Sequence, residues 1–89
     1  MCRNIKTLFN FDPPATSDEV GASALQFVRK LSGFNKPSKV NEEAFNLAVD
    51  RVSAAAQEML NTLETNAPPR DREVEARRAK ERAAVRYGQ

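Results

Sequence analysis

Cys2 is the first residue of this chain whose side chain could do chemistry, and it is the only cysteine. Removal of the initiator methionine would leave a thiol and an amine on the same residue. Arg3 and Lys6 nearby would favour the thiolate, which is the reactive form. The chain has no histidine to act as a base and no second cysteine to resolve a sulfenic acid. We therefore interpret Cys2 as a small, half-buried thiol and keep a thiol-dependent role for Cys2 and Arg3 as an alternative.

A second candidate site is a basic turn between two expected helices. Four basic residues fall within eleven positions, and no acidic residue lies between Glu19 and Glu42. The free N–H groups at the start of the second helix could bind phosphate or another anion beside two lysines. Basic residues at the end of the first helix also suit its dipole, and no nucleic-acid-binding motif is present. Capping and solubility are the simpler interpretation; the alternative is anion or nucleic-acid binding by Arg29, Lys30, Lys36, Ser38 and Lys39.

The residue types present exclude several classes of catalytic site. Without histidine, the chain lacks the base of a serine triad and the imidazole ligand of many zinc sites. Carboxylates in helical bundles can hold two metals, but those sites also use a Glu-x-x-His pair. Asp50 and Glu58 moreover fall outside the apolar stripe of their helix. The three glycines are too far apart to form a phosphate-binding loop. We predict no metal and no cofactor, and we do not favour an enzyme.

Length and hydropathy indicate one small cytoplasmic domain. Eighty-nine residues support a single domain, residues 1–89, with a modest core. No apolar run approaches the roughly 18–20 residues that span a bilayer, and the first fifteen residues lack the apolar region of a signal peptide. A single cysteine forms no internal disulfide, as expected in a reducing compartment. We expect no membrane contact.

The elements that would position these residues begin with a helix over 17–32. Thr16 and Glu19 form a capping-box pattern, and residues 13–14 are a Pro-Pro step that imposes an extended approach. Gly33 follows the last apolar position, where a left-handed helix stop is expected. The stripe itself consists of Val20, Ala24, Phe27, Val28 and Leu31. Residues 1–15, here called the strap, should pack on the body because they include Ile5, Leu8, Phe9 and Phe11.

The strongest periodic signal predicts a second helix over about 39–64. It begins at Ser38 or at Asn41, since both are good N-caps. Alanines in its stripe leave room for close approach of another helix. The two helices would form the helical hairpin, residues 16–64, with an apolar stripe on the second helix at Phe45, Ala48, Val49, Val52, Ala55, Ala56, Met59 and Leu63.

Residues 70–89 form a charged tail with seven basic and four acidic residues. Arg, Glu, Ala and Lys are good helix formers, which predicts a helix over 71–87 after the break at Pro68-Pro69. The tail has no continuous apolar stripe, so this helix is either solvated or completed by a partner. A second subunit could dock on it through Val74, Ala83, Val85 and Tyr87.

Several segments carry a family resemblance that covers nearly the whole chain. They include CRNIKTLFN at residues 2–10, PPAT at 13–16, ALQFVRK at 24–30, NEEAF at 41–45 and APPRDREVEA at 67–76. These segments resemble a bacterial family of short, uncharacterised hypothetical proteins, a domain of unknown function that opens Cys-Arg-Asn-Ile-Lys. The family carries no assigned activity, cofactor or partner, so the resemblance implies no functional residue.

Together these patterns predict an all-α fold, with an antiparallel helix pair, a packed N-terminal segment and a charged third C-terminal helix. The favoured function is that of a small non-catalytic interaction or scaffold protein that could form a homodimer or bind another protein. Anion or nucleic-acid binding through the basic turn is the first alternative. A thiol-dependent role of Cys2 is the second.

Overall fold

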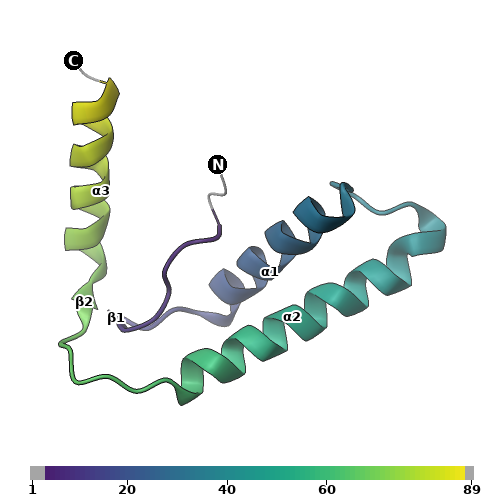
Figure 1. The fold of residues 1–89 in the computed structure, drawn as a ribbon, viewed down its shortest axis with the longest axis horizontal. Helices are drawn as coiled ribbons and strands as arrows, with labels where there is room; N and C mark the ends of the chain where they lie inside the picture. Colours follow the sequence, from purple (N-terminus) through teal and green to yellow (C-terminus); the bar gives the residue numbers. More distant parts are fainter. Residues whose placement is uncertain (1–3, 88–89) are drawn as a thin grey trace.

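The computed structural model describes the backbone of residues 4–87 and the side chains of residues 4–84. Three helices make up most of this part: α1 (Ser17–Ser32), α2 (Glu42–Thr62) and α3 (Arg72–Tyr87), with a 3₁₀ turn, η1 (Lys39–Asn41), before α2. Two short strands, β1 (Phe11–Asp12) and β2 (Arg70–Asp71), form a parallel pair (Figure 1). The fold is mostly helical, as predicted, with one short strand pair that the sequence did not indicate.

Helix α1 begins and ends at the predicted residues. The hydroxyl of Thr16 accepts a hydrogen bond from the backbone N–H of Glu19 at 3.2 Å, and the Glu19 carboxylate accepts from the Thr16 N–H at 3.0 Å. This reciprocal pair confirms the predicted capping box. At the other end, Gly33 has a left-handed φ of 80° and donates its N–H to the Arg29 carbonyl at 2.9 Å.

Both predicted N-cap residues stand at the start of α2, but neither side chain makes a capping hydrogen bond to the helix backbone. Ser38 precedes η1 and Asn41 precedes α2, and the Asn41 side-chain amide donates to the Ser38 hydroxyl at 2.8 Å. The helix ends at Thr62, two residues before the predicted limit, because Leu63 is already extended. In Figure 1 the chain runs out along α1, turns through residues 33–41 and returns along α2.

The core of the helical hairpin is small. Among the described side chains, the buried apolar ones are Val20, Ala24, Val28 and Phe45. The predicted α2 stripe is only partly covered, since Met59 and Leu63 expose 53% and 46% of their surface. Helix α1 has 16 residues and α2 has 21, so α2 extends beyond its partner.

The strap crosses from α1 to the start of α3. Strand β1 pairs with β2 in the register Phe11–Arg70 and Asp12–Asp71. Just before β1, Asn10 has a left-handed φ of 63°, a conformation that asparagine tolerates better than most residues. Its carbonyl accepts the Arg70 N–H at 2.8 Å, and its side-chain amide donates to the carbonyls of residues 67 and 68. These bonds join two segments far apart in the sequence.

The apolar residues of the strap pack to different degrees. Leu8, Phe9 and Phe11 are half-buried, whereas Ile5 exposes 44% of its surface. On α1, the hydroxyl of Ser23 donates to the Asn4 carbonyl, which ties the beginning of the described strap to the helix. The strap therefore contributes partial cover rather than fully buried side chains.

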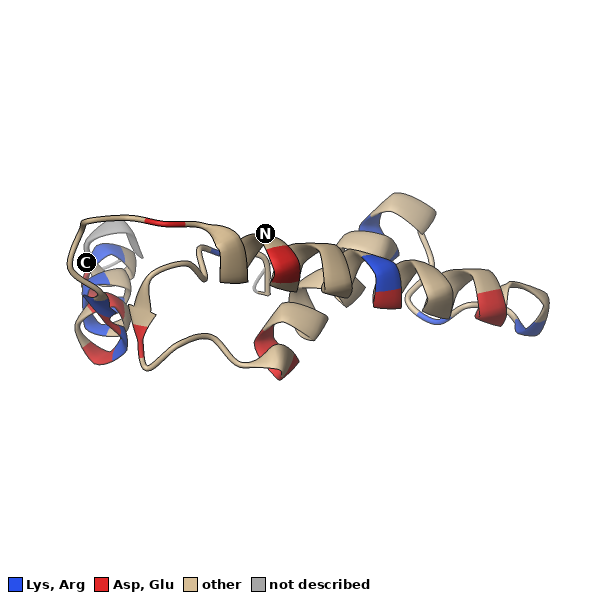
Figure 2. Ribbon diagram, turned by 90° about the horizontal axis from the view of Figure 1, so that it is seen from below, with Lys and Arg blue, Asp and Glu red and all other residues tan. Residues whose placement is uncertain are grey.

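Helix α3 stands apart from the helical hairpin (Figure 1). Its first turn is capped by Asp71, whose carboxylate accepts the Val74 N–H at 3.1 Å. Basic and acidic residues are interleaved along it (Figure 2). Only Arg72, Val74 and Glu75 are half-buried among its described side chains. Among the described side chains of α3, burial is therefore confined to its first turn.

Candidate functional site

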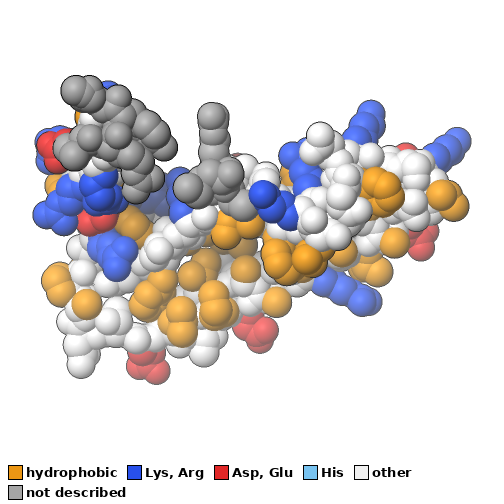
Figure 3. Space-filling view, turned by 45° about the horizontal axis from the view of Figure 1, so that its top comes forward, with side chains coloured by type: hydrophobic (Ala, Val, Ile, Leu, Met, Phe, Trp, Pro, Cys, Tyr) orange, Lys and Arg blue, Asp and Glu red, His pale blue; other side chains and the backbone are white. Residues whose placement is uncertain are grey.

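An apolar groove of about 350 Å³ lies on the helical hairpin near its turn. Figure 3 shows hydrophobic side chains gathered along the hairpin surface. The side chains around the groove come from the last turns of α1, the turn itself and the first half of α2. Its lining consists of Phe27, Val28, Leu31, Ser32, Phe34, Asn41, Ala44, Phe45, Ala48 and Val52. We call this surface the hairpin groove.

The helical repeat explains the shape of the hairpin groove. Phe27 and Leu31 are four residues apart on α1 and form one raised wall. On α2, Ala44 and Ala48 are likewise one turn apart, and their small side chains leave the hollow. Leu31 exposes 72% of its surface, Phe27 44% and Phe34 38%. Such a surface can bind an apolar part of another molecule.

Phe27 and Leu31, which belong to the apolar stripe predicted for α1, are therefore not part of the buried core. Val20, Ala24 and Val28 of the predicted stripe are buried, whereas Phe27 exposes 44% and Leu31 72% of its surface. Two packed helices cover only a narrow strip of each other. Residues beyond that strip stay exposed unless something else covers them.

A second cluster of polar contacts lies where the strap, α1 and α3 meet. The Glu19 carboxylate accepts a hydrogen bond from Nη2 of Arg72 at 2.6 Å, in addition to its bond from the Thr16 N–H. The Arg72 guanidinium, followed by that N–H, lowers the pKa of Glu19 from 4.5 to about 2. The guanidinium carbons of Arg70 and Arg72 lie 5.7 Å and 6.0 Å from the centre of the Phe11 ring. We call this cluster the Glu19–Arg72 junction.

Sequence reasoning missed the Glu19–Arg72 junction. Glu19 was explained by the capping box alone, and Arg72 by the charged tail. The signal available was the Pro-Pro step before each helix, which marks two helix starts but does not show that they meet. The pairing of β1 with β2 brings the start of α3, and with it Arg72, close to the start of α1.

In the predicted basic turn, some side chains form hydrogen bonds within the turn and others are exposed to solvent. Arg29 Nε donates to the Asn35 carbonyl at 2.9 Å, and the Ser38 hydroxyl accepts from Asn41, so both residues hold the turn in place. Lys30, Lys36 and Lys39 are exposed. Two glutamates, residues 42 and 43, occupy the first turn of α2, and their charge opposes an anion there. Binding by this turn stays a prediction.

Reversing the charge of Lys36 and Lys39 tests that prediction. If the turn binds nucleic acid, the double variant Lys36→Glu/Lys39→Glu should lose the salt-dependent binding of mixed oligonucleotides that the unmodified protein shows. Fluorescence anisotropy at several salt concentrations measures the effect. Absence of binding by the unmodified protein at low salt would rule out the hypothesis.

The thiol candidates Cys2 and Arg3 lie outside the described residues. Within residues 4–87, no three His, Cys, Asp or Glu side chains gather in a way that could hold a metal ion. No helix in this part of the chain has the length and apolar character needed to cross a membrane.

Comparison with known proteins places the chain in a family. Searches of curated proteins and of solved structures find no significant match. A family model described as "Uncharacterized conserved protein (DUF2277)" matches residues 1–78. This match includes the strap, the helical hairpin and the start of α3, which are the parts that form the groove and the junction. The chain belongs to the DUF2277 family of uncharacterised conserved proteins.

Proposed function

We propose that this chain is a non-catalytic interaction protein that self-associates, with a second copy of the chain covering the hairpin groove. The observation that carries the proposal is the exposed wall of Phe27 and Leu31 beside an apolar hollow. Among the described residues, the groove lining offers only Ser32 and Asn41 as polar side chains. An exposed apolar surface of this composition is more typical of a protein–protein interface than of a catalytic site.

The surface area of the chain supports a second copy. A compact monomer of 9.9 kDa has an accessible surface of about 5,200 Å². This chain exposes 7260 Å², about 2,000 Å² more than the compact monomer. A standard protein interface buries about 800 Å² on each partner. The excess therefore exceeds what one copy needs to contribute to a stable dimer.

The shape of the groove also fits a partner of the same kind. In a two-fold dimer the same patch of each subunit faces the other, so it must contain both a projection and a hollow. Leu31 lines the groove from α1 and is 72% exposed, and the small side chains of Ala44 and Ala48 line it from α2. If Leu31 of each copy inserts into the groove of the other, the exposed apolar surface of both copies is buried at the same time.

Light scattering after gel filtration tests the proposal. The unmodified protein should have the mass of a dimer, and its thermal midpoint should rise with protein concentration. Leu31→Lys should give a monomer, because a charge placed in an apolar contact must be desolvated. It should leave the isolated hairpin intact, since Leu31 is 72% exposed and a cation suits the end of α1.

Leu63→Lys is the matched control. Leu63 is also an exposed leucine, at 46%, but it lies outside the groove at the far end of α2. This variant should remain dimeric. A monomeric unmodified protein would refute the proposal. So would a dimer that persists in Leu31→Lys but dissociates in Ala83→Glu, because the contact would then lie on α3.

A further inference from the structure

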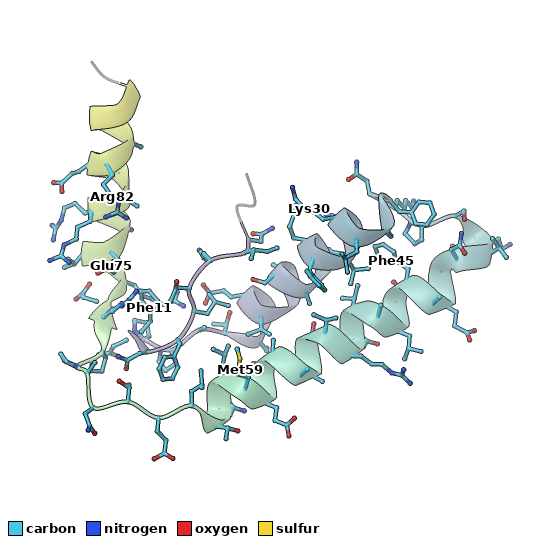
Figure 4. All side chains as sticks on the ribbon, in the orientation of Figure 1. Phe11, Lys30, Phe45, Met59, Glu75 and Arg82 are labelled. Atoms are coloured by element: carbon cyan, nitrogen blue, oxygen red, sulfur yellow. The ribbon has the colours of Figure 1, made fainter. Side chains whose placement is uncertain are left out.

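A second cavity, of about 510 Å³, lies between the strap and α3. Strap residues 6–8 and Phe11 line one side, and α3 lines the other. The Glu19–Arg72 junction contributes to its wall. In Figure 4, Phe11 lies at the foot of α3, with Glu75 and Arg82 farther along that helix. A cavity of this volume is in the usual range for small-molecule sites.

Positive charge dominates this cavity. Its lining contains four cations, Lys6, Arg70, Arg72 and Arg82, and two carboxylates. Both carboxylates have a counter-ion: Glu19 pairs with Arg72 at 2.6 Å, and the other, on α3, pairs with an arginine outside the lining at 3.5 Å. No ion pair of the described residues involves the remaining three cations. Lys6, Arg70 and Arg82 thus share one concave space, and none of them forms an ion pair with another described residue.

Arg72 supplies an independent indication of a missing acceptor. Its Nη2 donates to Glu19, but its Nε is buried and has no hydrogen-bond partner. A buried donor without an acceptor is unfavourable, and such groups are rare in folded proteins. Because this Nε has almost no solvent-accessible surface, an oxygen of a bound anion would reach it only after a shift of the Arg72 side chain.

The remaining wall is apolar. Leu8 and Phe11 line the cavity on the strap side, and Ala76 and Ala79 line it on the α3 side. A ligand that fills this space therefore needs an anionic head and an apolar or aromatic body. A phosphate monoester carries close to two negative charges at neutral pH and three acceptor oxygens, which matches three arginines and a lysine better than a carboxylate does.

We propose that the cavity between the strap and α3 binds a small phosphate ester, with the phosphate held by Lys6, Arg70, Arg72 and Arg82 and the organic part against Phe11 and the α3 alanines. The site is separate from the hairpin groove. Its test therefore does not depend on whether the protein self-associates.

Calorimetric titration with phenyl phosphate tests the proposal on the full chain. We expect a dissociation constant of about 1 mM or tighter, and weaker binding of inorganic phosphate and of benzoate. Arg82→Gln and Lys6→Gln should each weaken binding about tenfold, because each removes a charge-assisted contact from a different wall. Helical circular dichroism of each variant checks that the fold is retained.

Arg77→Gln is the matched control. Arg77 is an exposed arginine on the same helix, outside the cavity lining, so its removal should leave binding unchanged. Equal losses in Arg77→Gln and Arg82→Gln would mean general attraction to a basic helix and would overturn the proposal. Failure of the unmodified protein to bind phenyl phosphate would overturn it too, as would tighter binding of a single-stranded oligonucleotide that also depends on Arg77.

Discussion

Replacement of Phe45 with alanine is expected to lower the free energy of unfolding by about 3–5 kcal/mol. Phe45 is 7% exposed and is the only large aromatic side chain among the buried residues of the described chain. A domain of this length is typically stable by about 4–13 kcal/mol in total, so the variant should lose a large share of that stability. Urea titration followed by helical circular dichroism measures the loss.

Phe27→Ala provides the comparison for Phe45→Ala. Phe27 is 44% exposed and lines the hairpin groove, so its loss should cost the isolated hairpin less. If a second copy covers the groove, the cost of Phe27→Ala should change with protein concentration, whereas folding of Phe45→Ala should be impaired at every concentration. Equal, concentration-independent losses in both variants would contradict this assignment of core and surface.

Replacing the carboxylate of Glu19 with an amide is expected to loosen the attachment of α3, while the capping box persists because glutamine can also accept from the Thr16 N–H. This one group accepts from Arg72 at 2.6 Å and from the Thr16 N–H at 3.0 Å. In Glu19→Gln, α3 and the strap should become more sensitive to limited proteolysis than in the unmodified protein. The Glu19→Gln/Arg72→Gln double variant should be little less stable than either single variant, because both changes break the same ion pair.

The pH dependence of stability follows from the same contact. The pKa of Glu19 falls from 4.5 in the unfolded chain to about 2 in the folded protein, because Arg72 and the Thr16 N–H favour the carboxylate. Its contribution is therefore fully present above pH 4.5 and is lost as the pH falls from 4.5 toward 2. Urea titrations across this range should show a steeper decline for the unmodified protein than for Glu19→Gln.

Thr16→Ala separates the cap from the ion pair. This variant removes the hydroxyl that accepts from the Glu19 N–H, together with its 3.4 Å contact to the Glu19 carboxylate. It keeps the Thr16 N–H and Arg72 as donors to that carboxylate. It should cost about 0.5–2 kcal/mol, as loss of a helix cap does. It should also retain the acid sensitivity of the unmodified protein. An unchanged acid profile in Glu19→Gln would show that the junction does not couple α1 to α3.

The sequence was sufficient for the local parts of this molecule. The capping box of α1 depends on two residues three positions apart, and the left-handed stop depends on Gly33 and its neighbours in the same turn. The start of α3 is equally local, since Asp71 caps a residue three positions ahead. Hydrogen bonds of this range are encoded by adjacent residues, so reading the sequence predicts them well.

The candidate sites were less accessible to sequence reasoning. Phe27 and Leu31 have the spacing of core residues, and nothing in that spacing says how wide a strip α2 covers. The cations of the second cavity are scattered over residues 6–82 of the sequence, and only the tertiary fold brings them together. The basic turn, by contrast, was conspicuous because its charges are close together in sequence.

By itself the sequence determined both ends of α1, the ends of α2 and α3 to within a few residues, and which helix faces are apolar. Short-range hydrogen bonds and helical periodicity suffice for these features. Only the tertiary structure decided that Asn10 bonds to Arg70 and that Glu19 pairs with Arg72. Each of these contacts joins residues more than fifty positions apart, and many alternative pairings have similar local chemistry. The two-residue strands that create them are too short to leave a periodic pattern.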